Sequence, residues 1–216
     1  MTIKIIGKVP RWLAALLGMA ALFAVIAKAA EDAPPFADPP AGILLIASAE
    51  IQDPRFHHSV VLLLRHDGTG AFGIVINNPL GQRPLAALLS ETDGTDRKES
   101  EDSAVEGTIR VFVGGPVQPQ LGFVIHSSDY RRPETLVVGD QLRMTATPEV
   151  LRDIGQHRGP LKYLFALGYA GWGAGQLEGE IAQHHWFTAP ADPDLVFDAE
   201  RDTVWDKALA RRTREL

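Results

Sequence analysis

Glu178 and His126 are the first candidates for acid–base chemistry in this sequence. A helix expected over residues 174–184 places Glu178 beside the apolar face shared by Leu177 and Ile181, where a carboxylate needs a partner. His126 ends an apolar run and is followed by two serines and an aspartate. Two interpretations follow: a general acid/base or ligand-binding pair, or a carboxylate anchor and a satisfied strand-end histidine. We favour the second.

No complete catalytic motif accompanies these residues. The chain contains neither a G-x-S-x-G elbow nor H-E-x-x-H, and its lack of cysteine excludes thiol catalysis and disulfides. Glu180 and His184 have the i, i+4 spacing of a metal pair, but no third ligand is evident. We therefore expect no metal and no cofactor, and a binding protein rather than an enzyme. The alternative is a hydrolase that uses Glu178 and His126.

The glycine-rich residues 168–175 between an apolar run and the expected helix resemble a phosphate cradle, because bare amides at a helix start bind anions. Neither G-x-G-x-x-G nor G-x-x-x-x-G-K-[ST] is present. Glu178 and Glu180 near the helix start would repel a phosphate. The glycines are thus expected to serve a tight turn and close backbone packing rather than nucleotide binding.

The two glutamates of this helix are expected to differ. Glu178, near Ala182 and the apolar face, is predicted to be partly buried and hydrogen-bonded, whereas Glu180 shares the polar face with Gln176 and Gln183. Removing Glu178 should therefore cost more stability than removing Glu180.

Six residues form the candidate ligand or partner site: Asp53, Asn77, His126, Trp172, Gln176 and Glu178. If they line one open cleft, a ligand or enzyme site is favoured; if they are scattered and buried, they determine the fold. Trp172, Trp186 and Trp205 are interpreted as core or interface anchors. His57 and His58 would face opposite ways on a strand.

Apolar, β-branched runs must position these residues. Strands are expected at 42–47, 59–65, 71–76, 109–113, 121–125, 141–145 and 161–167. The turn at 67–70 predicts a hairpin, and Asn77-Asn78-Pro79 ends it. Helical turns are expected at 84–89, 147–155, 174–184 and 203–212, the second with Thr147 as N-cap and Pro148 at the first position. Consecutive strands without intervening helices favour a largely antiparallel α+β fold.

Residues 90–107 contain seven acids, two basic residues and no large apolar side chain except Val105, which predicts a solvated, mobile loop.

Several segments resemble the AlgH/YqgE family of bacterial proteins. They are GILLIA at 42–47, DPRF at 53–56, SVVL at 59–62, GAFGIVIN at 70–77, GGPV at 114–117, GFVIH at 122–126 and GYAGWGAGQLEGEI at 168–181. The resemblance implies an α+β fold with a bifurcated, partly barrel-like sheet and flanking helices. The family name AlgH suggests a regulatory role, and the resemblance implies no particular reaction.

This chain departs from the usual pattern of that family at three places. Ser48 and Ala49 stand where the family usually has Met or a similar residue followed by Pro, and Asn78 replaces a usual Arg or Lys. The third departure is a leader, whereas members of the family are normally cytoplasmic. A cytoplasmic transcriptional regulator is the remaining alternative, which the leader and the acidic charge disfavour.

The leader has the three parts of a secretory signal. Lys4, Lys8 and Arg11 precede an uncharged apolar run at 12–27, and Ala27-Lys28-Ala29 gives the A-x-A pattern of a cleavage site. We expect residues 1–29 to be a signal peptide or membrane anchor, 30–41 a proline-rich linker, and 42–216 the folded domain. The expected location is the periplasm. The alternatives are an inner-membrane anchor through 1–29, or the cytoplasm if the start is mis-assigned.

Charge limits the partners of the domain. The chain carries 21 Lys and Arg against 27 Asp and Glu, a formal charge of −6, and four of its basic residues precede residue 30. A net negative domain repels phosphate backbones, so nucleic acid is not expected as a partner. The sequence thus predicts a binding or regulatory protein of the cell envelope that recognises another protein or a small molecule.

Overall fold

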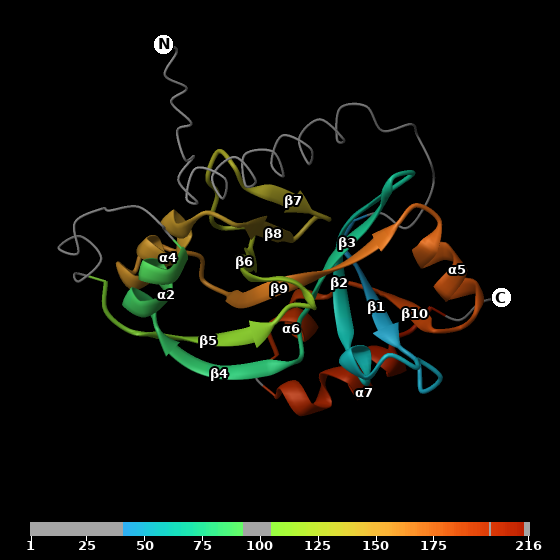
Figure 1. The fold of residues 1–216 in the computed structure, drawn as a ribbon. Helices are drawn as coiled ribbons and strands as arrows, with labels where there is room; N and C mark the ends of the chain where they lie inside the picture. Colours follow the sequence, from blue (N-terminus) through green and yellow to red (C-terminus); the bar gives the residue numbers. More distant parts are fainter. Residues whose placement is uncertain (1–40, 93–104, 199, 214–216) are drawn as a thin grey trace, which may run out of the picture. The chain divides into compact units, whose positions relative to one another are not determined.

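The apolar runs of the sequence form the strands of one large sheet in the computed structural model, which describes residues 41–92, 105–198 and 200–213 (Figure 1). These residues belong to one structural unit of the chain, Ala37–Leu216. The strands are β1 (Ile43–Ala47), β2 (Val60–Asp67), β3 (Gly70–Val75), β4 (Pro79–Pro84), β5 (Thr108–Val113), β6 (Val117–Ser127), β7 (Leu136–Val138), β8 (Leu142–Thr145), β9 (Tyr163–Gly173) and β10 (Trp186–Pro190).

The sheet divides at β9. Its main path runs β10-β1-β2-β3-β9-β6-β8-β7, and neighbours along this path are antiparallel. β3 pairs with the C-terminal part of β9, while β5 pairs in parallel with residues 165–167 and carries β4 on its outer edge. The α+β class with a largely antiparallel, bifurcated and partly barrel-like sheet is therefore confirmed (Figure 1).

The central strands carry long apolar stretches, such as residues 60–64 of β2, because these stretches are buried on both faces. In β2, Leu62 and Leu64 point into one hydrophobic cluster, whereas Val61 and Leu63 point into another. All four side chains are nearly inaccessible to solvent. The period of two along a strand thus sends one continuous run into two separate cores.

Short helices cover the sheet: η1 (Pro54–Phe56), α2 (Leu85–Thr92), α4 (Pro148–Gly155), α5 (Gln176–Ala182), α6 (Pro193–Val196), η2 (Arg201–Thr203) and α7 (Val204–Ala210). α2 and α4 lie side by side and share one cluster (Figure 1). α6 and α7 contribute Val196 and Val204 to the first of the clusters that β2 enters, and α5 contributes Leu177 to the second.

Most predicted elements are confirmed. The hairpin of β2 and β3 is antiparallel, and α4 begins at Pro148 and ends at Gly155 as expected. Thr147 occupies the N-cap in extended conformation, but its hydroxyl donates to Glu134 at 2.8 Å instead of capping the helix.

The predicted glycine-rich loop at 168–175 is wrong for most of its length, since β9 continues to Gly173. The glycines allow close backbone contacts within the sheet. A Cβ on Gly168 would meet the carbonyl oxygen of Gly115, and Gly168 has φ +73°. Only Ala174 and Gly175 remain between β9 and α5.

Two further features were not predicted. β4 is a largely exposed strand that begins at Pro79 and ends at Pro84, and it pairs with β5. Pro is compatible with such an edge strand. The strands β5 and β6 around Gly114-Gly115-Pro116 do not pair with each other but lie on opposite edges of β9.

The expected mobile loop at 90–107 lies mainly outside the described residues. At its start the prediction is wrong, because α2 continues to Thr92. At its end, Glu106 and Gly107 are exposed and outside helices and strands, as expected, while Val105 is buried. The predicted leader and nearly all of the linker, residues 1–40, also lie outside the described residues. Across the described ranges, no helix has the length and apolarity needed to cross a membrane.

Candidate functional site

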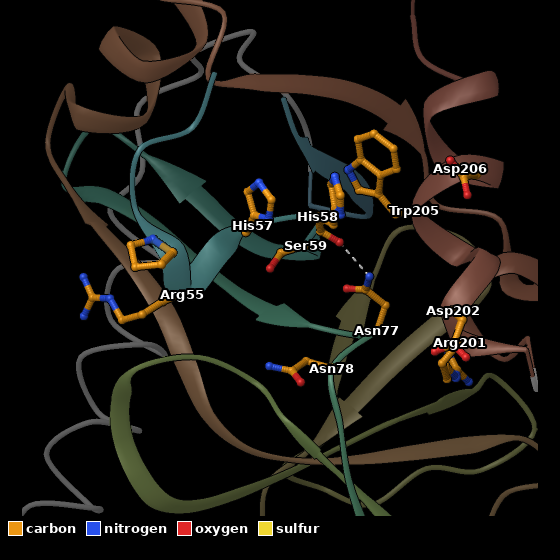
Figure 2. Close-up of a pocket in the computed structure, with 11 residues that line it drawn as sticks. Arg55, His57, His58, Ser59, Asn77, Asn78, Arg201, Asp202, Trp205 and Asp206 are labelled. Atoms are coloured by element: carbon orange, nitrogen blue, oxygen red, sulfur yellow. Dashed lines mark hydrogen bonds between the residues drawn. The ribbon is translucent and has the colours of Figure 1, made fainter. Parts of the chain in front are cut away.

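A polar cavity of about 400 Å³ opens between the η1 turn, the end of β3 and the start of α7 (Figure 2). Three segments far apart in the chain supply its walls. The lining residues are Pro54, Arg55, His57, His58, Ser59, Asn77, Asn78, Arg201, Asp202, Trp205 and Asp206. This volume falls within the range of small-molecule sites.

The η1 turn is fixed by its own residues. Asp53 is the N-cap and accepts from the backbone N–H of Arg55 at 3.0 Å, and Pro54 occupies the first helical position. The Arg55 guanidinium also forms a two-pronged contact with the Asp53 carboxylate, at 2.9 Å from Nε and 2.6 Å from Nη2. This contact holds the pKa of Asp53 below its ordinary value. The charge of Arg55 is therefore neutralised within the turn.

Asn77 clamps the chain that leaves this turn. Its Oδ1 accepts from the backbone N–H of Val60 at 2.8 Å, and its Nδ2 donates to the carbonyl of His58 at 2.9 Å (Figure 2). His58 has φ +54°, a left-handed conformation that histidine tolerates better than most residues. The Asn77 side-chain amide thus satisfies two backbone groups at the start of β2.

Three rings form one wall of the cavity (Figure 2). His57 and His58 stack at 4.5 Å between ring centroids, and His58 lies 4.4 Å from Trp205. The Trp205 indole donates to the carbonyl of Ala47 at 2.9 Å, which fixes α7 against β1. The expectation that the two histidines face opposite ways on a strand is wrong, because they lie in the turn before β2.

Arg201 is a buried cation in this cavity. Its residue is 7% exposed, its Nη1 donates to the carbonyls of Val196 at 2.8 Å and Ile76 at 3.4 Å, and its guanidinium lies 5.0 Å from the ring centre of Phe112. Its Nε has no hydrogen-bond partner within the described part of the chain. Burial, together with the nearby positive charge of Arg110, lowers the pKa of Arg201 to about 10.

No carboxylate of the described residues forms an ion pair with Arg201. Asp202 and Asp206 line the same cavity and are exposed, and neither forms an ion pair with a described cation. Asn78 and Ser59 bring a side-chain amide and a hydroxyl with no hydrogen bonds to described protein groups. The cavity therefore presents unpaired charges and free hydrogen-bonding groups, which suit binding of a small polar molecule.

The predicted site residues do not meet in one cleft. Asn77 lines the cavity and Asp53 caps the turn beside it. Trp172 and Gln176 lie at the junction of β9 and α5, where Trp172 packs against Phe56 at 6.4 Å between ring centroids. His126 and Glu178 belong to neither group.

The two glutamates of α5 were predicted to differ in burial and in their contribution to stability, with Glu178 the more important. Their environments support the opposite order. Glu178 is the exposed one, with a side chain 45% exposed whose carboxylate accepts from His66 Nε2 at 2.8 Å. Glu180 instead accepts from the indoles of Trp172 and Trp186, at 2.9 and 2.8 Å. The pKa of Glu178 is lowered, first by its own backbone amide at the helix start and then by His66.

His126 is fully buried in β6 and has partners on both ring nitrogens. Nδ1 lies 2.9 Å from the carbonyl of Ser127 and Nε2 lies 3.0 Å from the hydroxyl of Thr145. Burial lowers the pKa of His126 below its ordinary value. Its geometry fits a satisfied structural histidine.

Sequence reasoning missed Arg201, Trp205 and Asn78 as cavity residues. Asn78 stood out only as a departure from a family pattern, and Arg201 belongs to no motif. Among the residues that the structure describes, no group of three or more His, Asp or Glu side chains is arranged to hold a metal ion.

The chain is similar to a set of bacterial proteins along nearly all of its described length. The model of a family described as AlgH-like matches residues 44–216. A UPF0301 protein of Chelativorans sp. (strain BNC1) is 45% identical over 77% of this chain and 82% of its own length. A UPF0301 protein of Sphingopyxis alaskensis is 40% identical over 78% of this chain and 87% of its own length.

Two solved structures share the fold. The solution structure of the AlgH protein from Pseudomonas aeruginosa matches with a TM-score of 0.65 and 37% identity, over 82% of this chain and 92% of that one. The crystal structure of protein DIP2367 from Corynebacterium diphtheriae matches with a TM-score of 0.61 over 82% of this chain and 88% of that one. At 22% identity, the second likeness shows the fold alone.

Proposed function

The chain belongs to the AlgH-like family, and we propose that it is a binding protein that takes a small polar ligand in the cavity between η1 and α7. The observation that carries this proposal is Arg201, a buried guanidinium that lines the cavity and has no carboxylate partner among the described residues. A buried cation without an ion-pair partner is unfavourable, so an anionic group bound beside it would be stabilised.

The place of action in this proposal is the cell envelope. Its support is the leader pattern in residues 1–29 and the acidic charge of the remainder. N-terminal sequencing of the native protein tests it: a start at Ala30 or Glu31 in the periplasmic fraction is expected. An intact Met1 in the soluble cytoplasmic fraction would contradict export and leave the cavity proposal standing.

A ligand screen on the purified native protein tests the cavity itself. Small carboxylates, inorganic phosphate and amino acids are added singly, and the melting temperature is measured. We expect a class of anion-bearing compounds to raise it, because a ligand that binds only the folded state stabilises that state.

Arg201→Met should abolish that shift, since it keeps length and loses the charge. Arg201→Gln, which also removes the charge but keeps hydrogen-bond donors for the backbone carbonyls, serves as a second variant if the methionine protein is poorly folded. Arg158→Met is the control, because Arg158 is exposed and lies outside the cavity. No shift with any compound, or an equal shift in the Arg201 variants, would overturn the proposal.

A regulatory role is compatible with this proposal. Ligand binding would change the surface that η1 and α7 present at the cavity rim, and with it the affinity for a partner protein. The geometry gives no support to a hydrolase built on Glu178 and His126. His126 is buried in β6 and bonded to Ser127 and Thr145, while Glu178 is paired with His66.

A further inference from the structure

The charged residues around α7 divide into a paired and an unpaired group. Lys207 pairs with Asp198 at 2.6 Å, and Arg211 pairs with Asp192 at 2.7 Å. Among the described acids of this region, Asp202 and Asp206, which line the cavity, form no ion pair. These local cations thus neutralise acids outside the cavity and leave those within it unpaired.

Asp202 lies in η2 and Asp206 in the first turn of α7, and both exposed residues line the cavity (Figure 2). Two like charges that line one cavity repel each other, and the positive end of α7 offsets part of that repulsion in the free protein. A bound cation would relieve the remainder.

Neither arginine of the cavity satisfies these acids. Arg201 directs Nη1 at backbone carbonyls and stacks on Phe112, and Arg55 is held by Asp53. A buried positive group and two exposed negative groups therefore line one cavity without pairing with each other.

We infer that the cavity takes a small zwitterion of the amino-carboxylate class, with its carboxylate toward Arg201 and its ammonium group toward Asp202 and Asp206. This inference rests on the proposed function and names its ligand class. A molecule with both charges satisfies both unpaired sets at once, whereas a simple anion leaves the acids unpaired and gains nothing from them.

The remaining walls fit the other parts of such a molecule. The Ser59 hydroxyl and the Asn78 amide can form hydrogen bonds with the carboxylate or with a polar side chain of the ligand. The rings of His57, His58 and Trp205 can pack against an apolar side chain of the ligand. A cavity of about 400 Å³ has room for a free amino acid or a dipeptide, both of which carry the required pair of charges.

Calorimetry on the purified native protein tests the inference with charge-matched probes. The twenty common L-amino acids and glycine-containing dipeptides are titrated first. Their relative affinities show whether the natural ligand is a free amino acid or a dipeptide. The best binder is then compared with its analogue lacking the amino group and its analogue lacking the carboxylate. Each analogue should bind roughly tenfold or more weakly, because each loses one charged contact.

The double variant Asp202→Asn, Asp206→Asn assigns the ammonium contact. It should weaken the zwitterion roughly tenfold or more and leave the analogue without the amino group unchanged or tighter. Asp140→Asn is the control, because Asp140 is exposed and outside the cavity. Circular dichroism verifies that both variants fold.

The outcomes separate the two proposals. If simple carboxylates or phosphate bind and every zwitterion binds no better, the inference is overturned and the binding function stands. The inference is also overturned if the double variant weakens the zwitterion and its amine-free analogue equally. If no small molecule binds in either experiment, both proposals fail.

Discussion

Glu180 and Trp186 are joined by a hydrogen bond of 2.8 Å from the indole Nε1 to the carboxylate Oε2. The same oxygen accepts from Trp172 Nε1 at 2.9 Å, and Oε1 accepts from Gln176 Nε2 at 2.9 Å. Trp186 and Trp172 are only 2% and 7% exposed. One carboxylate therefore holds the indoles of β9 and β10 against α5.

Glu180→Ala should cost roughly 1–3 kcal/mol of unfolding free energy, because it leaves two buried indole N–H groups without an acceptor. Glu178→Ala should cost less than Glu180→Ala, since it leaves one ring nitrogen of the buried His66 without a partner instead of two indole N–H groups. Urea unfolding measures both. Glu180→Gln is the control that keeps an acceptor oxygen and should fall between wild type and alanine. Equal losses for the two alanine variants would contradict the assignment.

The sequence pattern favoured the opposite ranking of these glutamates for a physical reason. A helical wheel shows which face of α5 is apolar, and Leu177 is indeed fully buried there. It cannot show that indole N–H groups from two strands meet the polar face of the helix. The partners of Glu180 come from β9 and β10, so only the tertiary fold identifies its role.

Of the two asparagines in the cavity wall, Asn77 should contribute more to the unfolding free energy. Asn77→Ala removes the acceptor for Val60 N–H and the donor for the His58 carbonyl, and should cost roughly 1–3 kcal/mol. Asn77→Asp keeps an acceptor for Val60 and places a carboxylate against the His58 carbonyl, so it should also destabilise the protein. Asn78→Ala is the control and should change stability by less than about 0.5 kcal/mol. Urea unfolding that ranks Asn78→Ala with Asn77→Ala would show that the clamp contributes little.

The strands were predictable and the cavity was not, and the difference is one of sequence distance. A strand such as β2 is predictable from consecutive residues, because its apolar, β-branched pattern lies within eight positions of the chain. The cavity is assembled from residues 54–59, 77–78 and 201–206, which only the sheet topology brings together. Of the six predicted site residues, Asn77 alone lines it.

Gly179 and Gly175 give a matched test of backbone conformation, because a Cβ on either meets no atom within 4 Å. Gly179 lies inside α5, where Gly179→Ala should stabilise the protein by about 0.5–1 kcal/mol through the lower entropy of the unfolded chain. Gly175 has φ +73°, so Gly175→Ala should destabilise it by about 1 kcal/mol. Thermal and urea unfolding measure both. Changes of the same sign would contradict the conformations described for these two glycines.

His126 should make stability depend on pH between about 7 and 5. The Ser127 carbonyl can only accept, so Nδ1 carries a proton, and neutral Nε2 accepts from the Thr145 hydroxyl. Thr145 then accepts from Thr135, whose oxygen accepts from the backbone N–H of Arg132. Protonation of Nε2 turns it into a donor and forces the hydroxyls of this chain to reverse.

The sign of the effect follows from the pKa of His126, which burial lowers in the folded protein. The unfolded chain therefore binds the proton first as pH falls, so the contribution of His126 is complete above about pH 6.5 and is lost below it. The loss should approach about 1.4 kcal/mol per pH unit until the folded protein is also protonated. Urea unfolding at pH 7.5, 6.5 and 5.5 measures this slope. His126→Gln should flatten it, whatever its effect on stability at pH 7.5, and the exposed-site control His184→Gln should keep it. An unchanged slope in His126→Gln would place the titrating group elsewhere.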